Sequence, residues 1–127
     1  MFLSGIDIGG TSIKFGIFDE QLNLLQQWSR PTPKEPAEAA ALIAAQVEPY
    51  HVAAIGAGAP GTLNAARETI TADNLAWVDV PLAALLRRAS GLPAVVINDG
   101  HAAMLAEMRS GALQNVQTGI LLTLGTG

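Results

Sequence analysis

Residues 2–18, FLSGIDIGGTSIKFGIF, decide the fold. Two strand-like runs, Phe2–Ile8 and Ile13–Phe18, flank a Gly-Gly pair; the first is apolar and the second alternates apolar with other residues. A third run, Leu22–Trp28, follows after a short polar connection. Because short polar connections favour antiparallel hairpins, we predict that the chain begins with three antiparallel strands.

Helix-like and strand-like segments alternate in the rest of the chain. Three prolines mark a loop over Arg30–Pro36, and the segment 62–80 is expected to be irregular, with one short strand near 69–72. Gly91 is placed to end a helix as a left-handed cap. The other expected elements are helices over 35–48, after Pro81 and over 99–109, and strands over 52–57, 94–97 and 120–124. This order predicts an α/β fold, a mixed sheet with helices on its faces.

Length and composition exclude several classes of protein. A chain of 127 residues is expected to form one domain. Its 7 basic and 11 acidic residues give a net charge of −4, which provides no basic surface for nucleic acid. No apolar run is long enough for a transmembrane helix, and the absence of cysteine excludes thiolate metal sites within the chain. No export signal is seen at the N-terminus, so we expect a cytoplasmic protein with neither nucleic acid nor membrane as a partner.

The stretch DIGGTSIK at residues 7–14 is the first candidate site. Its two adjacent glycines allow main-chain N–H groups to approach an anion closely. Thr11 adds a hydroxyl, Lys14 a positive charge, and Asp7 a carboxylate that can hold Mg²⁺ through water. The spacing matches neither a Walker loop nor a Rossmann fingerprint. The structural alternative is a tight Gly-Gly hairpin with Lys14 solvated.

Asn98-Asp99 forms the second candidate site, at the carboxyl end of a predicted strand, where ligands bind in open α/β sheets. The Asp99 carboxylate could take a proton from a substrate hydroxyl, while Asn98 hydrogen-bonds a neighbouring one. The alternative is simple capping of the following helix. His101, two residues further on, is interpreted as a solvated or packed side chain.

Two glycine-rich turns are further candidates. In the stretch GAGAPG at residues 56–61, Gly61 could present its main chain to a bound hydroxyl, or the stretch could be only a flexible turn. The stretch LGTG at residues 124–127 could form a second phosphate clamp or a hairpin turn. Trp77, together with Asn74, could line a ligand loop or could anchor the core.

The order of these motifs closely resembles the ROK family, which groups bacterial sugar kinases, including glucokinases, with sugar-responsive repressors. The resemblance rests on DIGGT at 7–11, the turn at 56–61, NLAW at 74–77, Asn-Asp at 98–99 and LGTG at 124–127, and it covers essentially the whole chain. It implies an actin-like, ribonuclease-H-like ATPase lobe, here the N-terminal one of two.

The resemblance also implies roles for individual residues. Asp99 would be the catalytic base, directed at a hexose hydroxyl on C6, and Asn98, Asp99 and Gly61 would hold the sugar. Asp7 would assist Mg²⁺. The residues expected at the ATP phosphates are Gly9, Gly10, Thr11, Lys14, Gly125, Thr126 and Gly127. The implied function is that of an ATP-dependent hexose kinase of the glucokinase type, with a sugar-sensing lobe of a ROK regulator as the alternative.

This sequence departs from the family pattern in two ways. Gly100-His101 follows Asn-Asp where the family usually has Ala-Asn, which leaves the sugar open among glucose, N-acetylated hexosamines and fructose. The chain also ends before the family's later sugar contacts, its cysteine-rich zinc motif and its adenosine-binding lobe. We therefore expect residues 1–127 to be an N-terminal lobe without kinase activity of its own, with any structural zinc and any homodimer contact in the other lobe.

Overall fold

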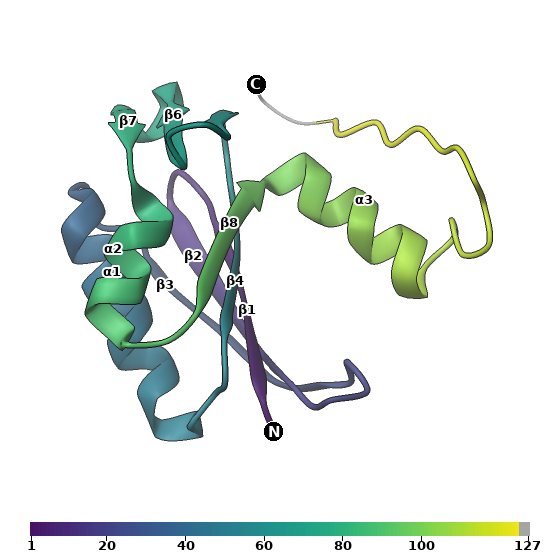
Figure 1. Cartoon of the computed structure of the whole chain (residues 1–127), viewed down its shortest axis with the longest axis horizontal. Helices are drawn as coiled ribbons and strands as arrows, with labels where there is room; N and C mark the ends of the chain where they lie inside the picture. The colour runs from purple at the N-terminus through teal and green to yellow at the C-terminus, as the bar shows by residue number, and fades with distance from the viewer. Residues whose placement is uncertain (125–127) are drawn as a thin grey trace.

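The computed structural model describes residues 1–124, which form two sheets and three α-helices (Figure 1). The strands are β1 (Leu3–Ile8), β2 (Ser12–Phe18), β3 (Leu24–Pro31), β4 (Ile55–Ala59), β5 (Thr62–Asn64), β6 (Thr69–Ala72), β7 (Trp77–Val80) and β8 (Ala94–Asn98). The helices are α1 (Pro36–Val47), α2 (Leu82–Ser90) and α3 (Asp99–Ser110), with short 3₁₀ turns at Glu48–Tyr50 and Asp73–Leu75.

The larger sheet has five strands in the order β3-β2-β1-β4-β8. β1 pairs with β2, and β2 with β3, in antiparallel fashion, whereas β1–β4 and β4–β8 are parallel. The prediction of a mixed sheet with three leading antiparallel strands is therefore confirmed. β3 begins at Leu24 because the Asp19 carboxylate accepts the main-chain N–H groups of Gln21 and Asn23 and closes the connection into a turn. The strand continues to Pro31, into the predicted loop, because Pro31 pairs with Ser12.

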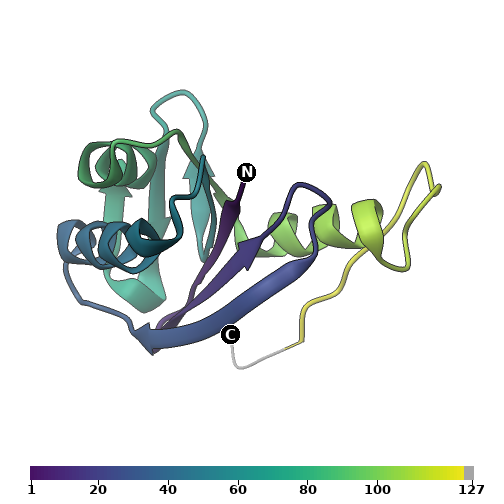
Figure 2. The same cartoon turned by 90° about the horizontal axis from the view of Figure 1, so that it is seen from below.

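Helices α1 and α2 cover one face of this sheet, and α3 starts on the other face and extends away from it (Figure 2). The core lies beneath α1 and α2; its largest fully buried side chains are Ile8, Ile13, Phe15, Ile17, Ile43, Val47, Ile55, Leu82 and Leu86. The predicted cap of α2 is confirmed, since Gly91 has φ +72° and its N–H donates to the Arg87 carbonyl at 2.9 Å.

The predicted turn over 56–61 is wrong in part. Residues 56–59 belong to β4, and only Pro60 and Gly61 form the turn. β4 is a central strand, with Gly56 paired to Gly5 on one side and to Val95 on the other. Hydrogen bonding along both edges outweighs the weak strand preference of glycine. The strand consequently extends to Ala59, two residues beyond its predicted end; it also begins three residues later than predicted, at Ile55.

The prediction of an irregular segment over 62–80 is wrong in part: the short strand expected near 69–72 is confirmed as β6, but the segments around it are also regular. Strands β5, β6 and β7 form a small antiparallel sheet, which we call the second sheet. Its strands are three or four residues long, too short for a recognisable period. Glu68 and Ala76 take left-handed conformations between them, at φ +53° each, without a glycine to signal the turn.

The strand predicted over 120–124 is not formed: these residues have no regular secondary structure. Ile120, Leu122 and Leu124 are 84%, 82% and 95% exposed. An alternating apolar pattern becomes a strand only when a neighbouring strand accepts its hydrogen bonds, and no such neighbour pairs with it within residues 1–124. The predicted phosphate turn at Gly125, Thr126 and Gly127 lies outside the described residues.

Candidate active site

Three predicted site segments lie at the same edge of the larger sheet. β1, β4 and β8 are adjacent and parallel, so their carboxyl ends point the same way. The Gly9-Gly10 turn follows β1, the Pro60-Gly61 turn follows β4, and Asn98 ends β8 directly before α3 (Figure 1). In open α/β sheets, ligands bind outside this edge.

A cleft of about 600 Å³ at this edge brings three of the predicted residues together. Its lining includes Asp7 from β1, Gly61 from the turn after β4 and Asp99 from the start of α3. Thr123 and Leu124 also line it, from the segment beyond α3. A carboxylate from a strand and a carboxylate from a helix N-terminus therefore share one space with a main-chain turn.

Asp99 occupies the first position of α3 and is exposed to solvent. Its Oδ1 accepts the N–H of Gly100 at 2.8 Å. Asn98 is the N-cap: its Oδ1 accepts the N–H of His101 at 3.2 Å. The capping alternative is thus correct for Asn98. Helix capping does not use both oxygens of the Asp99 carboxylate, because Asp99 Oδ2 has no hydrogen-bond partner within residues 1–124.

Gly61 is held from two sides. Its φ is +89°, and a Cβ at this position would overlap the main-chain oxygen of Thr71 and come within 2.8 Å of the Ala72 Cα in β6. On its other side, Asn98 Nδ2 donates to the Gly61 carbonyl at 2.8 Å. The turn is therefore rigid, and only glycine fits there without strain.

The Gly9-Gly10 connection is a tight hairpin turn. Gly9 N–H donates to the Ser12 carbonyl at 3.0 Å, and a Cβ on Gly9 would lie 2.8 Å from that oxygen. Thr32 braces the turn, because its hydroxyl donates to the Gly9 carbonyl at 2.7 Å and its N–H to the Thr11 carbonyl at 3.0 Å. Thr32 was not among the predicted site residues, because nothing in the local pattern indicates that it reaches back 23 residues to this turn.

Gly10 lines a separate space of about 670 Å³, which also includes Asn74 and Trp77. Gly9, Gly10 and Thr11 do not line the cleft that holds Asp99. Trp77 is 2% exposed, and its indole N–H donates to the Lys34 carbonyl at 2.8 Å. Trp77 is therefore a core anchor, as one alternative predicted, and it also lines this space together with Asn74.

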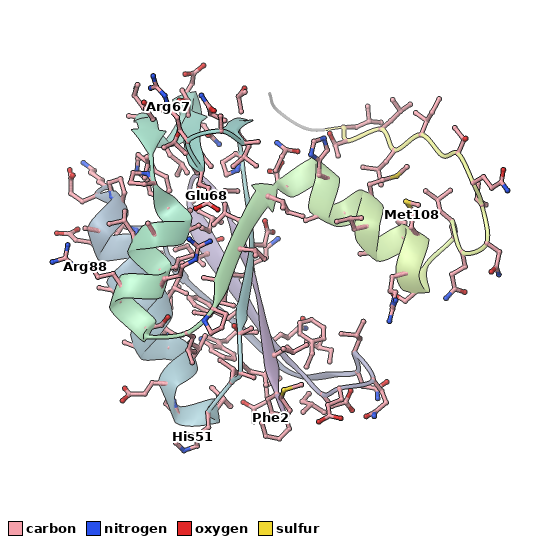
Figure 3. The ribbon with its side chains drawn as sticks, viewed as in Figure 1. Phe2, His51, Arg67, Glu68, Arg88 and Met108 are labelled. Atoms are coloured by element: carbon pink, nitrogen blue, oxygen red, sulfur yellow. The ribbon has the colours of Figure 1, made fainter. Side chains whose placement is uncertain are left out.

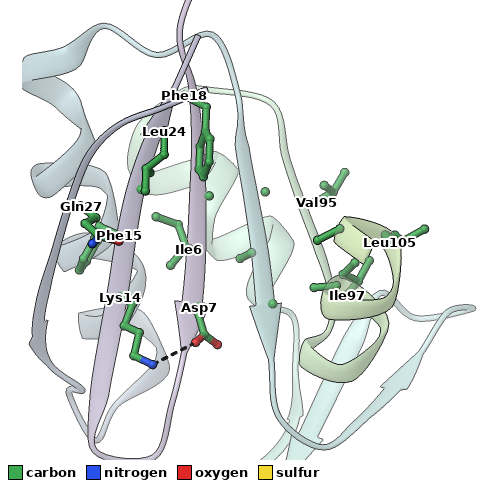
Figure 4. A pocket seen from close by; sticks show the side chains of 17 residues that line it. Ile6, Asp7, Lys14, Phe15, Phe18, Leu24, Gln27, Val95, Ile97 and Leu105 are labelled. Atoms are coloured by element: carbon green, nitrogen blue, oxygen red, sulfur yellow. Dashed lines mark ion pairs between the residues drawn. The ribbon is translucent and has the colours of Figure 1, made fainter. Parts of the chain in front are cut away.

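Lys14 faces Asp7 across the β1–β2 pair (Figure 4). The Lys14 Nζ lies 3.9 Å from Asp7 Oδ2, and the two side chains are 70% and 58% exposed. An ion pair this long and this exposed contributes little to stability, so both groups remain available for a ligand. The pair stands at one end of an apolar groove of about 530 Å³ that runs between the sheet and α3, with Phe18, Leu24 and Leu105 among its lining residues.

The acidic groups suit a single magnesium ion better than a metal cage. Within residues 1–124, no group of three or more histidine, cysteine or acidic side chains converges on one point. Mg²⁺ is usually held by one or two carboxylates together with water and substrate phosphates. The Asp7 carboxylate, exposed in the cleft, fits that requirement.

A charged network outside the cleft supports the second sheet. The Asp79 carboxylate accepts the Thr69 hydroxyl at 2.5 Å and pairs with Arg67 Nη1 at 2.8 Å. The Thr69 hydrogen bond, followed by Arg67, lowers the pKa of Asp79 below its usual range. Glu68 in turn pairs with Arg87 of α2 at 3.1 Å; Figure 3 labels Arg67 and Glu68 in this region. The sequence analysis did not identify these residues, because they come together only in the second sheet.

The chain belongs to the ROK family, whose model matches residues 3–127. Glucokinase from Streptomyces coelicolor is 39% identical over 128 residues, which cover 97% of this chain and 40% of that protein. The crystal structure of a ROK family glucokinase from Streptomyces griseus, in complex with glucose and AMPPNP, superposes with a TM-score of 0.81 at 37% identity, over 91% of this chain and 38% of that one. The actin-like ATPase fold that the motifs implied is thereby confirmed.

The chain spans about 40% of the length of the curated glucokinases it matches. A ROK family transcriptional regulator also superposes, with a TM-score of 0.78 over 91% of this chain and 32% of that one, but at 19% identity this likeness shows the fold alone. Among residues 1–124, no helix has both the length and the apolar character that crossing a membrane requires.

Proposed function

We propose that this chain is the N-terminal lobe of an ATP-dependent hexose kinase of the glucokinase type, which transfers the γ-phosphate to the C6 hydroxyl of the sugar. The observation that carries the proposal is the cleft in which Asp7, Gly61 and Asp99 meet at the carboxyl edge of the sheet. The similarity to glucokinases supports it, because the cleft is built from segments within the matched region.

In this proposal Asp99 is the general base. Its free carboxylate oxygen would orient the sugar hydroxyl and take its proton as the bond to phosphorus forms. The Asn98 side chain and the Gly61 main chain would hold neighbouring hydroxyls. Since phosphoryl transfer needs little covalent work from the protein, positioning and charge stabilisation account for most of the catalysis.

The nucleotide phosphates would lie toward the turn after β1. Gly10 and Thr11 would offer main-chain N–H and hydroxyl donors there, and Lys14 a positive charge that is already exposed. Gly9, whose own N–H is bound to the Ser12 carbonyl, would let the phosphates come close to the turn. The second phosphate turn at Gly125, Thr126 and Gly127 belongs to the same proposal. Asp7 would hold Mg²⁺ through water, and the ion would neutralise charge on the phosphates.

Further elements of the proposal concern the longer protein. Because the chain spans about 40% of its glucokinase relatives, residues 1–127 alone are expected to be inactive. Adenosine binding, any structural zinc and any homodimer contact would lie in a second lobe. We place the enzyme in the cytoplasm, with hexose and ATP as its ligands and no nucleic acid or membrane partner; the net charge of −4 supports the absence of nucleic acid.

The test is a panel of hexoses with ATP and Mg²⁺ on the full-length protein, with glucose, N-acetylated hexosamines and fructose as candidates. We expect one sugar to be phosphorylated with clear preference, and residues 1–127 alone to give no sugar phosphate above background. Robust turnover by the isolated chain would contradict the two-lobe proposal. A DNA-binding module encoded upstream of Met1, together with no transfer to any sugar, would favour the regulator.

A further inference from the structure

Asn98 joins two segments of the cleft through one side chain. Its Oδ1 accepts the N–H of His101 in the first turn of α3 at 3.2 Å, and its Nδ2 donates to the Gly61 carbonyl at 2.8 Å. Gly61 and Asn98 are 37 residues apart in the sequence. The start of α3 is thus tied directly to the turn that follows β4.

The Gly61 end of this tie has no room to move toward the second sheet. Gly61 lies so close to β6 that even a methyl group would overlap the Thr71 oxygen. Its left-handed φ of +89° also prevents most side chains from replacing it. The turn is therefore pressed against β6 on one side and hydrogen-bonded by Asn98 on the other.

The Asp99 end lies beside β4. A Cβ on Gly58 of this strand would be in ordinary van der Waals contact with the Asp99 Cα, at 3.4 Å. Asn98 itself is the last residue of β8 and pairs with Ala59, the residue before the Pro60-Gly61 turn. Where these two strands end, the side chain of Asn98 is the link between the turn and the helix.

Capping alone does not require asparagine here. Asparagine, aspartate and serine cap helices about equally well. Only asparagine combines a capping oxygen with an N–H donor long enough to reach Gly61. Its amide has two N–H bonds and two lone pairs, and the tie uses one of each. The remaining N–H and lone pair stay available for a sugar hydroxyl.

We infer that Asn98 is a positioning residue: before any sugar binds, it ties the Gly61 turn to the N-terminus of α3 and so sets the distance between the Gly61 main chain and the Asp99 carboxylate. This inference rests on the proposed function in so far as Asp99 is taken as the base. The tie itself is a property of the ligand-free protein and can be measured without a substrate.

The first arm of the test is amide hydrogen exchange on the ligand-free full-length protein. Asn98→Asp keeps the capping oxygen but replaces the donor by a second oxygen that faces the Gly61 carbonyl. We expect exchange in residues 61–63 to rise by about 2- to 12-fold, the factor that corresponds to one hydrogen bond. Asn98→Ser, which adds no charge and is too short to reach Gly61, should give the same change.

Asn64→Asp is the matched control. The Asn64 Oδ1 also accepts the main-chain N–H of the residue three positions later, Arg67, at 3.2 Å. Its amide nitrogen makes no hydrogen bond within residues 1–124, so the substitution adds the same charge without breaking a tie. We expect exchange around the Gly61 turn to be unchanged in this variant.

The second arm measures kcat and KM with ATP and a series of deoxysugars. If Asn98 positions the turn, kcat falls for every sugar in both Asn98 variants, in addition to any rise in KM. Unchanged exchange together with a rise in KM alone would overturn the inference and leave Asn98 as a sugar contact only. If the wild-type protein had no kinase activity, the proposed function would be wrong. The exchange measurements would still show whether Asn98 holds the Gly61 turn against α3.

Discussion

On one face of the five-stranded sheet, Ile6 and Ile8 of β1 are 4% and 1% exposed beneath α1 and α2. On the other face of the same strand lie Gly5, which has no side chain, and Asp7, whose side chain is 58% exposed. The neighbouring strands repeat the contrast, because Gly16, Gly56 and Gly58 also line the second face. The packed face supplies the stability of the domain, and the open face leaves space at its carboxyl edge for ligands and charged groups.

The largest expected effect tests whether the open face is the functional one. Asp99→Asn in the full-length protein should lower kcat by about 10²- to 10⁴-fold, since the amide cannot take the proton of the sugar hydroxyl. Steady-state kinetics with the preferred sugar would measure it. Glu38→Gln is the matched control, an exposed carboxylate on α1 that does not line the cleft, and should leave kcat unchanged. If Asp99→Asn retained the full rate, Asp99 would not be the base.

Two leucine-to-alanine substitutions compare how much the packed face and the open face of the sheet contribute to the free energy of unfolding. Leu86→Ala, on α2 at 0% exposure, should lower the free energy of unfolding by about 2–5 kcal/mol, because it leaves a cavity in the core. Leu105→Ala, on α3 at 56% exposure, should lower it by about 0.5 kcal/mol or less. Urea denaturation of each variant measures both values. Similar losses would show that α3 packs as firmly as α2.

A pair of glycine substitutions examines the rigidity of the cleft edge. Gly61→Ala should cost about 1–3 kcal/mol in backbone strain and a further amount from the overlap with Thr71. Gly91→Ala has a similar φ, +72°, but meets no atom within 4 Å, so it should show the strain alone. Thermal unfolding gives the difference between them. If the two variants were equally stable, the Gly61 turn would have to be free to move away from β6.

The smallest expected effect is on the pH dependence of stability, through Asp79 in the second sheet. The pKa of Asp79 is lowered in the folded protein by the Thr69 hydroxyl and Arg67, so the ionised form favours folding. This contribution is complete above about pH 4, the ordinary aspartate pKa, and is lost as the pH falls through the lower folded value. Asp79→Asn should therefore reduce the dependence of stability on pH between neutral and strongly acidic solution. Urea denaturation midpoints of both proteins, measured from pH 7 downward, would test this. If Asp79 contributed nothing, the midpoints of the variant would depend on pH as those of the wild type do.

Local patterns predicted the elements that carry their own signals. The β1–β2 hairpin has alternating residues and a Gly-Gly turn, α2 has an apolar face and a glycine cap, and β8 runs directly into α3. The second sheet carries no such signal, because strands of three and four residues show no period and depend on one another for hydrogen bonds. The strand predicted over 120–124 has the right pattern but no neighbouring strand within residues 1–124 to pair with.

Periodicity and motifs predicted the alternation of strands and helices, the family and the residues that meet at the cleft. Side-chain periodicity and motif order can be recognised in the chain without knowledge of the fold. The three-dimensional arrangement alone brings Asp7, Gly61 and Asp99 to one cleft, Thr32 to the turn at Gly9, and Asn98 to Gly61. The two hydrogen bonds join residues 23 and 37 positions apart, and the cleft residues are further apart still. Strand pairing brings such residues together, and no local pattern encodes it.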